Sequence, residues 1–226
     1  MLKPKAFLFD LDGVITDTAE FHYLAWKQLA EELGVKIDRA FNEQLKGISR
    51  MDSLEKILAL NPDYQDMPVE EKERLATKKN EHYQDLIKTI SPNDISPGIE
   101  KLLKEIKAQE MKIGLGSASK NAVMVLEQLE LTHYFDYIVD AAKVTKGKPN
   151  PETFTTAADH FGVAYSECVG VEDAASGVQA LNSAGMFSIG VGKDLTEADY
   201  RVECTNELKL EEILSYYRNW KSEELA

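Results

Sequence analysis

The chain has 226 residues, of which 43% are hydrophobic and 29% are charged, and its formal net charge is −13. This balance is typical of a globular protein rather than a disordered one, and the length suits one large domain or a core domain with an insert. The excess of negative charge argues against nucleic acid or an anionic membrane as a partner.

The cysteine content and the absence of long apolar segments indicate the cellular location of the protein. Cys168 and Cys204 are too few for a disulfide framework, so we expect both to be reduced. The apolar stretch near the N-terminus is broken by Asp10 and lacks a cleavage site, and no segment approaches the roughly 18 apolar residues of a membrane span. We therefore expect a cytoplasmic protein without membrane contact. We also expect a monomer.

The first third of the chain predicts one strand and then a group of helices. Residues Phe7, Leu8 and Phe9 lead into Asp10, and an apolar run of this kind ended by a glycine predicts a buried parallel strand. Apolar spacing and capping residues then predict helices at 19–33, at 39–45, from after residue 50 to residue 60, and at 69–90. Because the next convincing strand begins only near Met111, we place an all-α insert at residues 17–89.

From residue 97 onward, helices and strands alternate regularly. The pattern predicts helices at 99–109, 121–129, 151–161 and 175–184, and strands at 112–116, 137–140, 168–171 and 187–191. Such alternation indicates a parallel sheet covered by helices on both faces. We therefore predict an α/β fold with a doubly wound, Rossmann-like core (residues 1–16 and 90–226) and an inserted four-helix cap. Sheets of this type bind ligands beyond the carboxyl ends of their strands.

The end of the first strand carries two aspartates in the string DLDGVITDT. Aspartate is disfavoured in strands, so the presence of Asp10 and Asp12 there suggests a chemical role. Residues spaced i and i+2 point the same way from an extended backbone. The two carboxylates could then serve one metal ion and one substrate, one as nucleophile and the other as proton carrier. A DxD triplet alone would fit equally well an Asp-Gly turn with a solvated Asp10.

Three further strands are also followed by polar residues. Ser117 directly follows the strand at 112–116 and can bind a phosphate oxygen together with backbone N–H groups. Lys148 follows the strand at 137–140 and could neutralise charge shared by Asp10 and a phosphoryl group. Glu172 and Asp173 follow the strand at 168–171 and could hold a divalent cation.

Each of these signals also has a simpler explanation. Ser119 or Asn121 could merely cap the next helix, Lys148 could be a solvated loop lysine, and Glu172 with Asp173 could complement a helix dipole. Their convergence on one edge of the sheet favours a common site. Oxygen ligands without a cluster of His or Cys favour Mg²⁺, and the reaction class that follows is metal-stabilised phosphoryl transfer to the first aspartate.

The segments DLDGVITDTAEFH, LKGISR, SASKN, KPNP and GVEDAASGVQA carry a resemblance to a known family. Their order resembles the four sequential motifs of the haloacid dehalogenase superfamily of phosphotransferases and, within it, the β-phosphoglucomutase family. The resemblance extends over the whole chain. It implies an isomerase that interconverts β-D-glucose 1-phosphate and β-D-glucose 6-phosphate through a phosphoaspartate enzyme and β-glucose 1,6-bisphosphate, with Mg²⁺ as cofactor and phosphorylated glucose as substrate.

Site residues are expected on both the core and the insert. We expect Asp10 to be the phosphoryl acceptor and Asp12 the general acid and base, assisted by Ser117 and Lys148. The expected metal ligands are Asp10, Asp12 through its backbone carbonyl, Glu172 and Asp173. The expected substrate-binding residues are His22, Trp26, Gly47, Arg50, Ser53, Lys79, Ser117, Ala118, Ser119, Lys120 and Asn121.

The insert is what separates a mutase from a phosphatase. A phosphatase needs one phosphate site, whereas a phosphate shift through a bisphosphate needs a second, remote site. Arg50 presents a planar fork suited to phosphate and could form that site with Ser119, Lys120 and Asn121.

Two other parts of the insert leave alternatives open. His22 and Trp26 share one helix face at spacing i, i+4, where a buried core pair is the more usual meaning of the tryptophan. Lys78 and Lys79 lie on a helix that could be a solvated face, and the pattern does not choose between them.

A Mg²⁺-dependent sugar-phosphate phosphatase and a non-catalytic sugar-phosphate-binding regulator are the alternative functions.

Overall fold

The computed structural model describes residues 2–45 and 48–224, and within them six parallel strands form one sheet. Their order is β3-β2-β1-β4-β5-β6. The strands are β1 (Ala6–Phe9), β2 (Lys112–Leu115), β3 (Tyr137–Ile138), β4 (Cys168–Glu172), β5 (Phe187–Val191) and β6 (Tyr200–Val202). Strand β1 lies near the middle, paired in parallel with β2 and β4. This confirms the predicted doubly wound α/β fold.

Alternating side chains of β1 pack on opposite faces of the sheet. Phe7 and Phe9 belong to a core with α5 (Ile99–Ala108), α6 (Ala122–Gln128) and α9 (Leu210–Glu224). Ala6 and Leu8 belong to another core with α7 (Glu152–Phe161) and α8 (Ala175–Ser183). Because both faces are covered, the strand consists of apolar residues without a polar alternation, and its functional residues begin only where it ends.

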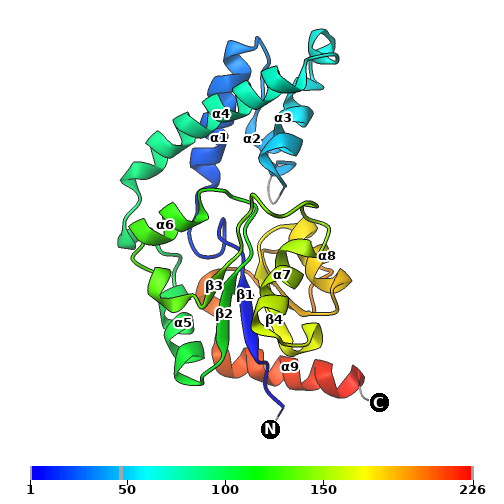
Figure 1. Ribbon diagram of the computed structural model, residues 1–226. Coiled ribbons are helices and arrows are strands. Elements are labelled where there is room, and N and C mark those ends of the chain that lie inside the picture. Colours follow the sequence, from blue (N-terminus) through cyan, green and yellow to red (C-terminus); the bar gives the residue numbers. More distant parts are fainter. Residues whose placement is uncertain (1, 46–47, 225–226) are drawn as a thin grey trace.

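The first four helices form a second group beyond one end of the sheet (Figure 1). They are α1 (Ala19–Glu32), α2 (Arg39–Glu43), α3 (Arg50–Leu58) and α4 (Val69–Leu86). Trp26, Leu29, Leu54, Ile57 and Leu75 are among the buried side chains of a core that these helices share with one another. An apolar core of its own is what a folding unit requires, which supports the proposal that residues 17–89 form a cap domain.

The two chain crossings between the helical group and the sheet lie side by side. Thr16 forms isolated bridges with Asp12 and with Ile95, and its Oγ1 donates to the carbonyl oxygen of Asp94 at 2.7 Å. The N–H of Ser96 donates to the carbonyl oxygen of Ile15 at 2.9 Å. Hydrogen bonds therefore hold the outgoing and the returning chain together where a hinge would act.

Several boundaries differ from the sequence prediction. The predicted strand at 137–140 is only Tyr137–Ile138, and the predicted helix at 69–90 ends at Leu86 and continues as a short 3₁₀ turn (Ile87–Thr89). Further 3₁₀ turns lie at Pro62–Tyr64, Pro92–Asp94, Thr132–Tyr134, Tyr165–Glu167 and Thr205–Glu207. Strand β6 and helix α9 were not predicted, and the three residues of β6 are too few for a periodic signal. None of the described helices is both long and apolar enough to cross a membrane.

We predict that Thr16→Val lowers the free energy of unfolding by about 1 kcal/mol, because it removes a partly buried hydrogen bond whose donor, the Thr16 side chain, is shielded from water. Thr89→Val is the matched control, since the hydroxyl of Thr89 also donates to a backbone carbonyl but is exposed. Urea unfolding monitored by circular dichroism measures both. Equal stability of the two variants would contradict a structural role for the bridge.

Candidate active site

A cavity of about 600 Å³ lies between the helical cap and the carboxyl ends of the strands. Most of the predicted site residues line it: Asp10, Asp12, His22, Trp26, Arg50, Ser53, Lys79, Ser117, Ala118, Ser119, Lys120, Asn121 and Asp173. Lys148 and Glu172 lie buried beside it. Gly47, predicted to bind substrate, lies outside the described residues. The structure thus brings core and cap residues to one space.

The turn after β1 depends on Gly13. Its φ of +80° lies in the left-handed region that favours glycine. A Cβ atom built at Gly13 would lie 2.0 Å from Oδ2 of Asp173. The glycine therefore allows the turn that carries Asp10 and Asp12 to approach the acidic loop after β4.

Lys148 lies at the centre of the acidic cluster. Its Nζ donates to Oδ1 of Asp10 at 2.6 Å and also to Oε1 of Glu172, and its side chain is fully buried. Burial alone would lower the pKa of Lys148, but the charges of Asp10 and Glu172 raise it above its usual range. The ammonium is therefore charged, and the loop lysine expected as one alternative is instead a buried partner of two carboxylates.

Three carboxylates fit the predicted metal site. Oxygens of Asp10, Glu172 and Asp173 lie within 4.8 Å of one another, and carboxylate oxygens are the ligands that Mg²⁺ prefers. The second oxygen of Glu172 accepts from the N–H groups of Asp173 and Ala174 at 3.0 and 3.1 Å, which fixes the acidic loop. Burial raises the pKa of Glu172 to about 7, although Lys148 opposes this shift. The donor set therefore fits a hard divalent cation.

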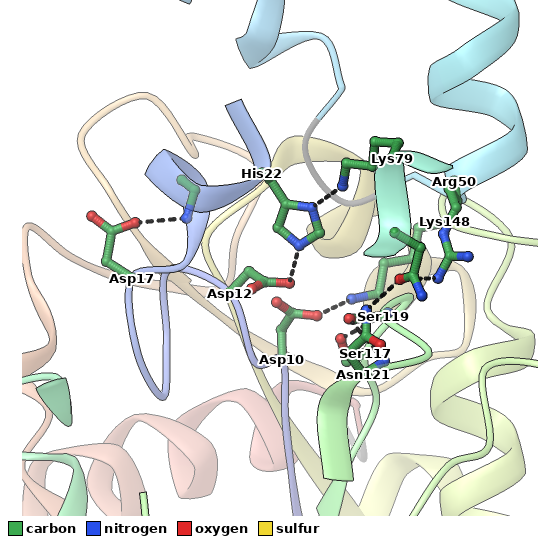
Figure 2. A network of polar contacts seen from close by, with 12 residues as sticks. Asp10, Asp12, Asp17, His22, Arg50, Lys79, Ser117, Ser119, Asn121 and Lys148 are labelled. Carbon is green, nitrogen blue, oxygen red and sulfur yellow. Dashed lines mark hydrogen bonds and ion pairs between the residues drawn. The ribbon is translucent and has the colours of Figure 1, made fainter. Parts of the chain in front are cut away.

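Asp12 faces the cap rather than Lys148 (Figure 2). Its Oδ2 lies 3.9 Å from Nε2 of His22, and Nδ1 of His22 lies 2.8 Å from Nζ of Lys79. Burial, followed by the charge of Asp10, raises the pKa of Asp12 to about 8. A carboxyl group with this pKa carries a proton at neutral pH and can still release it, as a general acid and base must.

Lys79, not Lys78, is the cap lysine of this site. Its Nζ lies 4.6 Å from the ring centroid of Trp26 and 4.7 Å from that of Tyr83, and the residue is 3% exposed. Burial, followed by the charge of Arg50, lowers the pKa of Lys79 to about 7. Lys78 is exposed and pairs with Glu32. Trp26 has both of the roles considered for it: it lines the cavity, and it also belongs to the apolar core of the cap.

The loop after β2 presents hydroxyl groups to the cavity. Oγ of Ser117 accepts from the N–H of Ser119 at 3.1 Å, and Oγ of Ser119 accepts from the N–H of Asn121 at 3.2 Å. A hydroxyl that accepts in this way can still donate its proton to a phosphate oxygen. Asn121 directly precedes α6 but its side chain makes no capping hydrogen bond, so the simple capping role considered for it is not observed. Lys120 is exposed at the cavity rim.

One face of α4 carries further residues that contact the predicted site and that were not predicted from the sequence. Tyr83 is fully buried and stacks on His22 with ring centroids 4.0 Å apart. Asn80 and Gln84 bond to Asn121 of the core at 2.8 and 2.9 Å. These residues and Lys79 form two i, i+4 pairs, a helical spacing that could have identified the face.

We predict that His22 makes the protein less stable in mild acid. Burial, then the charges of Lys79 and Arg50, lower the pKa of His22 well below its usual range. Below pH ~6.5 the unfolded chain takes up a proton that folded His22 does not, so stability present above that pH is lost as the pH falls.

The experiment compares thermal unfolding of wild type, His22→Gln and His133→Gln between pH 8 and pH 5. His22→Gln should lose less stability than wild type over this range, by up to about 1 kcal/mol, because the His22 side chain keeps 28% of its surface exposed. His133 is exposed, so its variant should follow wild type. Parallel curves for wild type and His22→Gln would show that His22 titrates normally.

Comparisons with known proteins agree with this site. A family model described as haloacid dehalogenase-like hydrolase matches residues 4–185. A β-phosphoglucomutase of Bacillus subtilis is 45% identical over 97% of this chain and 98% of its own length. The crystal structure of a Clostridium difficile β-phosphoglucomutase superposes with a TM-score of 0.95 at 49% identity, covering 97% of this chain and 99% of that one.

A phosphatase is also among the relatives. The fructose-1-phosphate phosphatase YqaB of Escherichia coli is 33% identical over 81% of this chain and 94% of its own length. The similarity to the mutases is higher in identity and in coverage of this chain. The chain therefore belongs to the haloacid dehalogenase-like family and, within it, to the β-phosphoglucomutases.

Proposed function

We propose that this protein is an isomerase that interconverts β-D-glucose 1-phosphate and β-D-glucose 6-phosphate through β-glucose 1,6-bisphosphate. The observation that carries the proposal is a single cavity with phosphate-binding groups at two places. Ser117 and Lys148 accompany Asp10 on the core side, whereas Arg50 and Asn121 meet at the boundary with the cap. A bisphosphate intermediate needs both places, and the similarity to named β-phosphoglucomutases supports the same function.

In the forward reaction, a phosphoryl group on the Asp10 carboxylate is attacked by the 6-hydroxyl of the sugar. Asp12 in its ionised form takes the hydroxyl proton as the new oxygen–phosphorus bond forms and the bond to Asp10 breaks. After the bisphosphate has turned round, Asp10 attacks the phosphate at position 1, and Asp12 returns the proton to the departing sugar oxygen. The pKa of about 8 for Asp12 suits both directions.

Mg²⁺ is the proposed cofactor. Asp10, Glu172, Asp173 and the backbone carbonyl of Asp12 would hold it, and when bound it would neutralise charge on the transferring phosphoryl group. Lys148 supplies a second positive charge beside Asp10. The protein would thus be a phosphoprotein during turnover, with the phosphoryl group on Asp10.

The cap has to protect the phosphoaspartate from water while the bisphosphate turns round. The two hydrogen-bonded chain crossings near Thr16 and Ser96 are the proposed hinge for cap movement. Exclusion of water is more important for a mutase than for a phosphatase, because water is the phosphatase's second substrate. The cytoplasmic location and the monomeric state stay predictions.

The central test measures mutase activity and phosphoenzyme formation in parallel. Asp10→Asn should abolish both labelling by a phosphoryl donor and turnover, because no carboxylate remains to accept the phosphoryl group. Asp12→Asn should still label but lose about 10²–10⁴-fold in transfer to and from sugar. Full mutase activity in Asp10→Asn would remove Asp10 from the mechanism.

Phosphate release distinguishes the proposed mutase from a phosphatase. Wild type with β-glucose 1-phosphate, the bisphosphate and Mg²⁺ should form glucose 6-phosphate with little inorganic phosphate. Stoichiometric release of inorganic phosphate would favour the phosphatase alternative.

We predict that Arg50→Ala loses at least about tenfold in mutase kcat/KM while slow hydrolysis of the phosphoenzyme continues. A charged contact to phosphate contributes roughly 1.5–3 kcal/mol, which corresponds to one to two decades in rate. Initial rates at subsaturating β-glucose 1-phosphate measure the first effect, and decay of labelled phosphoenzyme measures the second. Equal turnover of wild type and Arg50→Ala would place the remote phosphate elsewhere.

A further inference from the structure

A chain of four side chains joins the cap to the core at the remote end of the cavity. Nη2 of Arg50 donates to Oδ1 of Asn80 at 2.7 Å, and Nδ2 of Asn121 donates to the same oxygen at 2.8 Å. Nε2 of Gln84 then donates to Oδ1 of Asn121 at 2.9 Å. Arg50 and Asn80 belong to cap helices α3 and α4, whereas Asn121 precedes α6 of the core.

We propose that Asn80 is a positioning residue that orients Arg50 and Asn121 toward the remote phosphate and thereby favours substrates with two phosphate-bearing positions. The inference rests on the proposed function, because only a bisphosphate intermediate requires this second site. Asn80 itself takes no part in the transfer step. Its role is to hold two donors in one direction before a phosphate arrives.

The chemistry of the donors fixes the orientation of the amides. A guanidinium can only donate, so Asn80 must present its oxygen to Arg50. The same oxygen can then bond Asn121 only if Asn121 presents its NH₂ group, which leaves the Asn121 oxygen for Gln84. One charged group thus determines three amide orientations.

This arrangement leaves donors for a phosphate. Arg50 uses one of its five N–H groups on Asn80, and Asn121 uses one of its two. Both residues line the cavity, and Asn121 is 6% exposed. A phosphate oxygen can therefore bind both side chains without displacing Asn80. The entropic cost of ordering a flexible arginine falls on folding rather than on substrate binding.

The absence of charge on the Asn80 side chain is as important as its shape. A neutral acceptor orients the guanidinium and leaves its positive charge for the substrate. A carboxylate at this place would accept the same two hydrogen bonds but would neutralise Arg50 and repel phosphate. Asn80→Asp and Asn80→Leu therefore separate charge from orientation.

The experiment measures mutase kinetics with β-glucose 1-phosphate and phosphoenzyme formation from acetyl phosphate, both in Mg²⁺. Asn80→Leu should raise KM for the sugar phosphate about tenfold and change kcat by less than about twofold, because two side chains must now be ordered on binding. Asn80→Asp should raise KM further. Acetyl phosphate has no second phosphate position, so its rate of phosphoenzyme formation should stay at the wild-type value in both variants.

Lys78→Gln is the matched control, since Lys78 lies on the same helix but is exposed and pairs with Glu32. An unchanged KM in Asn80→Leu would overturn the inference, and so would an equal loss with acetyl phosphate. If Asn80→Leu is poorly folded, the near-isosteric Asn80→Asp decides alone, and its KM must rise.

A measurement of binding affinity distinguishes failure of this inference from failure of the proposed function. Calorimetry measures the affinity of β-glucose 1,6-bisphosphate for Asp10→Asn, with and without Asn80→Leu. The second substitution should weaken binding about tenfold. Unchanged affinity overturns the role of Asn80 whatever reaction wild type catalyses, whereas absence of mutase activity in wild type overturns only the proposed function.

Discussion

The arrangement of the site depends on the buried ammonium of Lys148. The protein has a net charge of −13 and yet gathers three carboxylates within 4.8 Å of one another. Buried carboxylates without a positive partner would repel one another and take up protons. Lys148 bonds both Asp10 and Glu172 and is held in the charged form by them. Removing one partner of such a group leaves an uncompensated buried charge, which is strongly destabilising.

This ion-pair cluster also determines which partner each acidic residue faces. Asp10 and Glu172 face Lys148, whereas Asp12 faces His22 in the cap. Asp12 therefore lacks a direct ion pair with the buried lysine, and burial with the charge of Asp10 raises its pKa to about 8. Asp12 thus has the protonation behaviour that its proposed role as proton carrier requires.

Helix α4 positions the cap residues that contact the cavity, as the ends of the strands position those of the core. Lys79 and Tyr83 support His22 from one side, and Asn80 and Gln84 reach Asn121 from the other. One helix therefore connects the proposed proton-transfer side of the cavity with the proposed remote phosphate site. Movement of the cap would displace both sets of contacts together.

The sequence by itself determined the first five strands of the sheet, the helices of the cap and the residues at the strand ends. Apolar strands, capping residues and the DLDG turn are local signals, and parallel strands place their carboxyl ends at one edge whatever their order. Only the tertiary structure decided which partners these residues take. Lys148 meets Asp10 across 138 positions in the chain, and Lys79 rather than Lys78 enters the cavity because a helix turns neighbouring side chains about 100° apart. Asn80 acquires its significance only from Arg50 and Asn121. Helical spacing can mark the face that such residues share, but it does not identify their partners, because these depend on how two separately patterned layers are brought face to face.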